Sequence, residues 1–145
     1  MKNLSSAQAH FLPAYMMNSQ AMPRILVVDD DPMFGKIMKR AAECFGAHIT
    51  FVQSAEALSN EHLEDSDVAI IDFDLGALTG LDVIQRLDDK SPLPVVLVSA
   101  DDRQRGQQWP DSIQQFLIKE RGPFAIIHAA FEAHVIARLK NQFQR

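Results

Sequence analysis

Short apolar runs along the chain alternate with longer segments in which apolar residues recur every three or four positions. The runs are typical of buried strands, and the wider spacing is typical of helices with one apolar face. We expect strands at 25–28, 49–52, 68–71, 95–98 and 116–118. Strands that alternate with helices in this way favour a parallel sheet covered by helices on both faces.

Helices are predicted between these strands, although the helical pattern is clearer in some segments than in others. Proline suits the first turn of a helix and glycine suits its end, so a helix is expected over Pro32–Phe45, just before Gly46. Ser54 is expected to cap a short helix. Two further helices are expected, one over 81–87 and one that begins at Pro123.

The segment Arg103–Gln115 lies where a fourth helix would be expected, but its composition argues against a regular one. It contains Gly106 and the pair Trp109-Pro110, and a proline inside a helix costs about 3 kcal/mol. This irregular region is therefore expected to be a short helix or an ordered loop.

Length and composition bound the domain organisation. The chain has 145 residues, of which 47% are hydrophobic, and this suits one domain of ordinary size with a real core. Residues 1–23 show no lasting period, so they are expected to form a leader outside the core. The folded domain is then expected to occupy 24–145.

Charge and hydropathy exclude several classes of function. The net charge is −5 and Lys and Arg form no block, which argues against nucleic-acid binding by this domain. No apolar run reaches the length of about 20 residues that a membrane span needs, and no secretory signal is visible. A single cysteine, Cys44, fits a reducing compartment. We therefore expect a cytoplasmic protein without a membrane partner.

Polar side chains stand where four of the predicted strands end. The carboxyl ends of parallel strands meet at one edge of the sheet, which is where ligands bind in such folds. The residues are Asp29 and Asp30 after the first strand, Asp72 after the third, Ser99 after the fourth and Lys119 after the fifth. One small area is therefore predicted to hold three carboxylates, a hydroxyl and an ammonium group.

This set of side chains suits a metal-assisted phosphoryl site. Carboxylates packed together raise one another's pKa, and Mg²⁺, which prefers oxygen ligands, would relieve the repulsion. Asp72 could then accept a phosphoryl group, while Ser99 and Lys119 bond its oxygens. Taken singly, each residue also has an ordinary explanation: Asp29–Asp31 could cap a helix, Ser99 could be another cap and Lys119 a solvated charge. Their joint occurrence at separate strand ends favours the shared site.

At this point the sequence resembles the receiver domain of bacterial two-component response regulators, over about Arg24–Leu139. The motifs that carry the resemblance are Ile25–Pro32, Ile70–Asp72 with Gly80 downstream, Val95–Ala100 and Phe116–Lys119. The resemblance implies a flavodoxin-like, doubly wound sheet of five parallel strands. It also implies a signalling role, in which the domain catalyses only its own phosphorylation and dephosphorylation and is not otherwise an enzyme.

The resemblance further implies roles for individual residues. Asp72 would be the phosphoacceptor, supplied by a histidine kinase or a histidine phosphotransfer protein. Asp30, Asp72 and the backbone carbonyl of Asp74 would bind Mg²⁺ directly, and Asp29 would act through water. In the switch, Phe116 would turn inward when the Ser99 hydroxyl moves, and Lys119 would bind the phosphoryl oxygens. A downstream protein would read the signal, and homodimer formation is left open.

The chain departs from the family pattern at several positions. Glu120 follows Lys119 where proline is common, so the peptide bond there is expected to be trans. Gly76 also stands where proline is common. The irregular Arg103–Gln115 segment replaces part of the face through which such domains usually pass the signal on.

Two other interpretations stay open. The segment Ile70–Leu75 looks like the nucleophile motif of haloacid dehalogenase-type phosphatases, but no aspartate follows Asp111 to supply their later acidic motif. The other alternative is a degenerate receiver that serves only as a protein-interaction module. The intact acidic set argues against it, while the irregular segment leaves it open.

Overall fold

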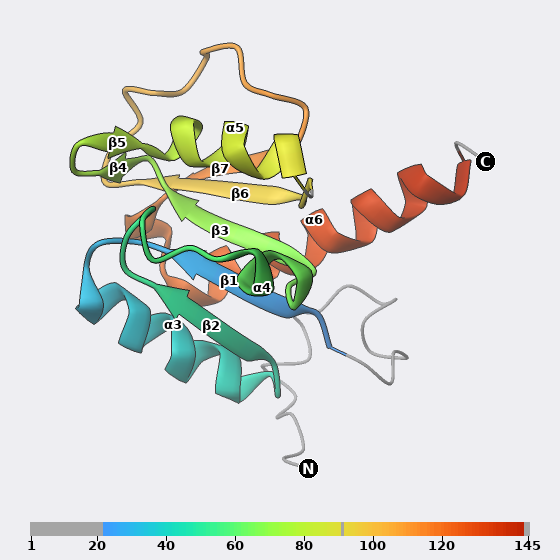
Figure 1. The fold of residues 1–145 in the computed structure, drawn as a ribbon. Helices are drawn as coiled ribbons and strands as arrows, with labels where there is room; N and C mark the ends of the chain where they lie inside the picture. Colours follow the sequence, from blue (N-terminus) through green and yellow to red (C-terminus); the bar gives the residue numbers. More distant parts are fainter. Residues whose placement is uncertain (1–21, 91, 144–145) are drawn as a thin grey trace.

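The computed structural model describes residues 22–90 and 92–143, so the predicted leader lies almost wholly outside the described residues. Five parallel strands form the central sheet in the order β2-β1-β3-β6-β7 (Figure 1). They are β1 (Arg24–Val28), β2 (His48–Val52), β3 (Val68–Asp72), β6 (Val95–Ser99) and β7 (Ile113–Ile118). The expected doubly wound parallel sheet is therefore confirmed.

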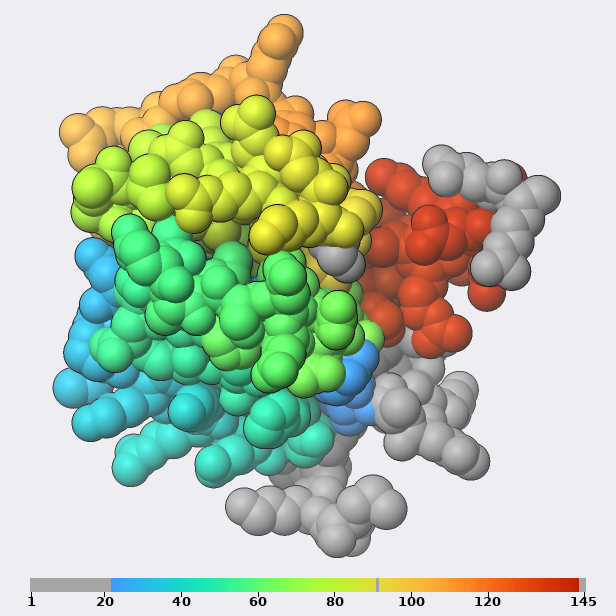
Figure 2. Space-filling model, in the orientation of Figure 1, coloured from blue at the N-terminus to red at the C-terminus, as the bar shows by residue number. Residues whose placement is uncertain are grey.

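Two helices cover each face of the sheet. Helices α3 (Pro32–Cys44) and α6 (Pro123–Phe143) lie on one face, and α4 (Asn60–Glu64) and α5 (Gly80–Lys90) lie on the other. In Figure 1 the last turns of α6, coloured red, extend past the edge of the sheet, and in Figure 2 the red atoms project from one side of the molecule. No helix within the described residues is both long enough and apolar enough to cross a membrane.

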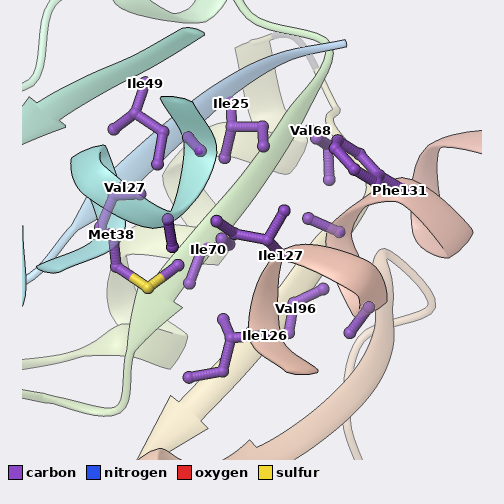
Figure 3. Close-up of a cluster of buried hydrophobic side chains, with 14 of the residues drawn as sticks. Ile25, Val27, Met38, Ile49, Val68, Ile70, Val96, Ile126, Ile127 and Phe131 are labelled. Atoms are coloured by element: carbon purple, nitrogen blue, oxygen red, sulfur yellow. The ribbon is translucent and has the colours of Figure 1, made fainter. Parts of the chain in front are cut away.

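The core divides into two layers because successive side chains of a strand point to opposite faces. On β1, Ile25 and Val27 pack toward α3 and α6, whereas Leu26 and Val28 pack toward α4 and α5. Figure 3 shows the first layer, in which Ile127 of α6 meets strand side chains at its centre. All four strand residues are at most 1% exposed. Strand β3 is buried along its whole length as well, so the strand-end aspartates follow two strands that are fixed by packing on both faces.

The predicted short helix begins later than expected, which corrects the role of Ser54. Ser59 is the cap of α4, and its hydroxyl accepts a hydrogen bond from the backbone N–H of His62 at 3.3 Å. The Nδ1 atom of His62 accepts one in return from the N–H of Ser59, at 3.0 Å. Ser54 instead accepts a bond from Ala57 within a turn. The reciprocal pair of bonds at Ser59, with Leu63 buried behind it, explains why the helix starts there.

A two-stranded hairpin that the sequence did not suggest follows β3. Its strands are β4 (Asp74–Leu75) and β5 (Leu78–Thr79), and they pair in antiparallel fashion. Gly76 in the turn has a φ of 78°, a left-handed conformation that glycine adopts without strain. The hairpin brings the chain back beside the end of β3, so that α5 begins at Gly80.

Residues 100–112, drawn in orange at the top of Figure 1, form turns and an extended stretch without a helix. Of the two alternatives left open, the ordered loop is the one observed. Strand β7 begins at Ile113, three residues before the predicted start, and its pairing with β6 shifts register between Val95 and Val96. The Lys119–Glu120 peptide bond is trans, as expected.

Candidate functional site

Three aspartates from two neighbouring strands lie together at the carboxyl edge of the sheet. Asp72 is the last residue of β3, and Asp29 and Asp30 follow β1, which pairs with β3 in parallel. Each of the three offers one carboxylate oxygen, and these three oxygens lie within 4.8 Å of one another. Asp29 is 0% exposed and Asp72 3%, whereas Asp30 faces solvent. The site therefore has two buried carboxylates, those of Asp29 and Asp72, and one that is exposed to solvent, that of Asp30.

Asp31 follows Asp29 and Asp30 in the sequence but has a different structural role. Its carboxylate caps α3 by accepting a hydrogen bond from the backbone N–H of Met33 at 2.9 Å. Its own backbone N–H donates to Oδ1 of Asp29, also at 2.9 Å. The helix-cap explanation thus holds for Asp31, while Asp29 and Asp30 belong to the acidic cluster.

This division of tasks predicts the effect of Asp31→Ala. The loss of a side-chain cap costs about 1 kcal/mol, so the free energy of unfolding should fall by roughly that amount. Mg²⁺ affinity should stay close to that of the native protein, because the backbone bond to Asp29 remains. Urea unfolding and a metal titration measure the two effects. A large loss of Mg²⁺ affinity in this variant, with the fold intact, would contradict the assignment.

Lys119 stands between the two buried carboxylates. It is the residue after β7, where η1 (Lys119–Arg121) begins, and its Nζ lies 2.7 Å from Oδ2 of Asp29 and 3.4 Å from Oδ2 of Asp72. Beyond this ion pair, Oδ2 of Asp29 has no hydrogen-bond partner among the described residues. One ammonium group therefore faces two buried carboxylates, and the charge of the cluster is not balanced.

The pKa values of the cluster reflect this imbalance. Burial raises the pKa of Asp72 to about 6, the negative charge of Asp29 adds to the rise, and Lys119 opposes it. Burial also raises the pKa of Asp29, which the hydrogen bond from Lys119 offsets only in part. Burial alone would lower the pKa of Lys119, but the two carboxylates outweigh it and raise that pKa.

The donor set fits a hard divalent cation. Such ions prefer carboxylate, carbonyl and water oxygens, and Mg²⁺ usually keeps several waters. The cluster offers carboxylates from Asp29, Asp30 and Asp72, with a buried oxygen that lacks a full set of partners and an excess of negative charge. Asp74 follows two residues after Asp72, and its backbone N–H acts to lower the pKa of the Asp72 carboxyl. The residues present could therefore hold the Mg²⁺ ion expected from the sequence.

Ser99 and Phe116 come from neighbouring strands, with Ser99 at the carboxyl edge and Phe116 two residues before the end of β7. Ser99 is the last residue of β6 and is 5% exposed, and its hydroxyl accepts a hydrogen bond from the backbone N–H of Asp101 at 3.5 Å. Phe116 of β7 stacks on Trp109, with ring centroids 5.9 Å apart and planes inclined by 12°. The guanidinium of Arg105 lies over the Phe116 ring at 5.1 Å. Phe116 thus contacts two residues of the 100–112 loop.

The structure adds two contacts that sequence reasoning missed. Lys119 Nζ lies 4.6 Å from the centroid of the Phe34 ring, and Arg103 pairs with Asp101 at 2.8 Å. Helical spacing could have marked Phe34 as a core residue, but nothing in the pattern links α3 to Lys119. The Asp101–Arg103 pair lies in the irregular loop, where no periodic signal exists.

Comparison with known proteins places this geometry in a family. Residues 25–131 match the family model described as response regulator receiver domain. The probable transcriptional regulatory protein TcrX of Mycobacterium tuberculosis is 34% identical over 80 residues, which are 54% of this chain and 34% of that protein. The regulatory protein VirG of Rhizobium rhizogenes is 28% identical over 81 residues, 55% of this chain and 34% of VirG. The aligned part thus spans about a third of these relatives.

Solved structures show the same architecture. The response regulator protein TrrA of Thermotoga maritima, solved in complex with Mg(2+)-BeF, superposes with a TM-score of 0.60 at 25% identity and covers 68% of this chain and 87% of that one. A receiver domain protein from Clostridium thermocellum has a TM-score of 0.68 at 19% identity, covers 81% and 98% respectively, and supports the fold alone. With a family model that matches from β1 into α6, this chain belongs to the response regulator receiver domains of two-component systems.

Proposed function

We propose that the domain accepts a phosphoryl group on Asp72 from a histidine kinase or a histidine phosphotransfer protein. One observation carries the proposal: a carboxylate buried at the end of β3 lies 3.4 Å from the Lys119 ammonium and within 4.8 Å of the carboxylates after β1. A buried carboxylate that faces both an ammonium group and other carboxylates is suited to accept an anionic phosphoryl group, with a metal ion to offset the negative charge. The modified domain then signals to a downstream protein.

The residues of the chain divide the work of the transfer. An oxygen of Asp72 attacks phosphorus, the phosphorus–nitrogen bond of the donor breaks, and the donor imidazole keeps the electron pair and takes up a proton. Lys119 and Ser99 bond the oxygens of the attached group. Asp30, Asp72, the Asp74 carbonyl and, through water, Asp29 would hold Mg²⁺, which would supply positive charge to neutralise the phosphoryl oxygens.

The same features weigh against the two alternative functions. A degenerate interaction module has no use for two buried carboxylates, since burying charge without a ligand destabilises the fold. A haloacid dehalogenase-type phosphatase needs a metal-binding acid late in the chain, whereas the acids beside Asp72 come from the first strand. The proposed domain turns over no external substrate beyond its own phosphoryl donor.

A chemical phosphorylation assay tests the proposal. The chain is incubated with acetyl phosphate and Mg²⁺, and intact mass spectrometry should show one added phosphoryl group that hydroxylamine removes, as expected of an acyl phosphate. Excess EDTA should prevent the adduct. An adduct that forms equally well in EDTA, or that resists hydroxylamine, would contradict the assignment to a metal-assisted aspartate.

The stack between Trp109 and Phe116 predicts an optical signal. If Phe116 turns inward when Ser99 moves, Trp109 loses its partner and its fluorescence should change in wavelength or intensity on addition of Mg²⁺ with beryllofluoride, a phosphoryl mimic. The chain contains one tryptophan, so the signal has a single source. Trp109→Phe serves as the blank. Unchanged emission at a beryllofluoride concentration that blocks phosphorylation would show that Phe116 does not move.

A further inference from the structure

Lys119 has a third partner besides its two carboxylates, the ring of Phe34. The Nζ atom lies 4.6 Å from the ring centroid, within the range of a cation–π interaction, and Phe34 is only 8% exposed. We propose that Phe34 is a positioning residue that keeps the Lys119 ammonium at the site when a metal occupies the carboxylates. This inference rests on the proposed phosphorylation of Asp72 and deepens it.

The backbone of α3 fixes the place of the ring. Asp31 caps the helix and Pro32 opens it, so Phe34 belongs to a first turn that is held at its start. A Cβ at Gly35 would lie 2.6 Å from the ring of Phe51 on β2, so the first turn presses directly against that strand. Phe34 is also part of the buried core layer around α3 and α6. The ring therefore has little freedom to follow Lys119, and Lys119 must come to the ring.

The Phe34 ring can attract the Lys119 ammonium even when a divalent cation occupies the carboxylates. Lys119 lies against the carboxylates of Asp29 and Asp72, and these are two of the three carboxylates that could also hold a divalent cation. A bound cation and the ammonium would therefore draw on the same two carboxylates and repel each other. The face of a phenyl ring attracts an ammonium but is no ligand for a hard cation. Phe34 would thus retain Lys119 beside Asp72, ready for the oxygens of a phosphoryl group.

Binding of beryllofluoride in saturating Mg²⁺ measures this effect. Phe34→Leu, which removes the ring, should weaken beryllofluoride binding by about three- to tenfold, the range expected for a partly desolvated cation–π contact. Phe34→Tyr keeps an aromatic face and should restore most of the affinity. Mg²⁺ affinity without beryllofluoride should be similar in all three proteins, because Phe34 contacts no metal ligand in the argument. Phe34→Met takes the place of the leucine variant if that variant does not fold.

A double-mutant cycle separates this role from simple packing. In the Lys119→Met background, Phe34→Leu should cause no further loss of beryllofluoride affinity, and the same pair should show favourable coupling in urea unfolding without metal. An equal loss in both backgrounds, or a failure of tyrosine to restore affinity, overturns the inference while leaving the proposed function intact. If the native protein binds no beryllofluoride with Mg²⁺, the proposed function fails and the inference with it.

Discussion

Replacement of Asp72 by asparagine is expected to abolish the phosphoryl adduct and, in the absence of metal, to make the protein more stable at neutral pH. Asparagine keeps the shape of the side chain but removes its charge and its nucleophilic oxygen. Burial and the charge of Asp29 raise the pKa of Asp72 to about 6, so ionisation of this carboxyl opposes folding. The free energy of unfolding should rise by about 1–3 kcal/mol at neutral pH.

The pH dependence of this gain follows from the direction of the shift. The folded-state pKa of Asp72 lies above 3.8, the ordinary value for an aspartate, so the folded state holds the proton more tightly than the unfolded chain does. The favourable contribution of the protonated carboxyl is complete below about pH 4 and is lost as the pH rises through about 6. Urea unfolding in EDTA should therefore show a stabilised asparagine variant above pH 6. The difference should vanish below about pH 4.

Asp102→Asn is the matched control, because Asp102 is an exposed acid in the nearby loop. It should leave the stability almost unchanged at every pH. Addition of Mg²⁺ should stabilise the native protein more than Asp72→Asn, since a ligand that binds only the folded state raises its stability. An Asp72→Asn protein that is less stable than the native protein in EDTA at neutral pH would show that the charge on Asp72 does not destabilise the fold.

Gly80→Ala is expected to be the most disruptive of the glycine substitutions near the site. A Cβ at this position would collide with the backbone carbonyl oxygen of Asp72 and lie 3.1 Å from the Cα of Phe73. The backbone N–H of Gly80 also bonds to the carbonyl of Phe73 at 2.7 Å, which holds the two segments together. Because backbone atoms cannot move aside as a flexible side chain can, the variant should lose about 1–3 kcal/mol or more. The displaced Asp72 should also be phosphorylated more slowly.

Gly76→Ala supplies the comparison, because it replaces a glycine in the β4–β5 hairpin just before Gly80, where a different constraint applies. A Cβ there meets nothing within 4 Å, and only the positive φ of 78° is unfavourable. We expect a cost of about 1 kcal/mol and an unchanged rate of phosphorylation. Thermal unfolding and adduct formation with acetyl phosphate, measured on both variants, make the test. If Gly80→Ala matches Gly76→Ala in both measurements, the close approach to Asp72 is not a constraint.

Local patterns were sufficient to predict the parts of the fold in which each strand is apolar throughout. Val68–Ile71 and Val95–Val98 are buried on both faces, as their continuous apolar runs predicted. The polar residues that follow such runs were expected at one edge, because all strands of a parallel sheet run in the same direction. Asp29, Asp72 and Lys119 lie together there.

Local patterns were not sufficient where a segment allowed more than one local structure or left no periodic signal. Ser54 and Ser59 are both suitable helix caps, and the reciprocal bond from His62 together with burial of Leu63 selected Ser59. The β4–β5 hairpin has strands of two residues, too short to leave a period in the sequence. The 100–112 loop contains Pro110 and several glutamines, so composition excluded a regular helix without saying what would replace it.

By itself, the sequence determined the order of the strands along the chain and the identity of the side chain at the end of each. Hydrophobic burial depends on each side chain separately, so the spacing of apolar residues in the sequence indicates which positions face the core. Only the tertiary structure decided which residues lie against one another around the site. Phe34 lies against Lys119, Trp109 against Phe116, and Gly80 against the carbonyl of Asp72. These contacts join residues of different helices, strands and loops, and their distances depend on how those elements pack together rather than on the preference of any one segment.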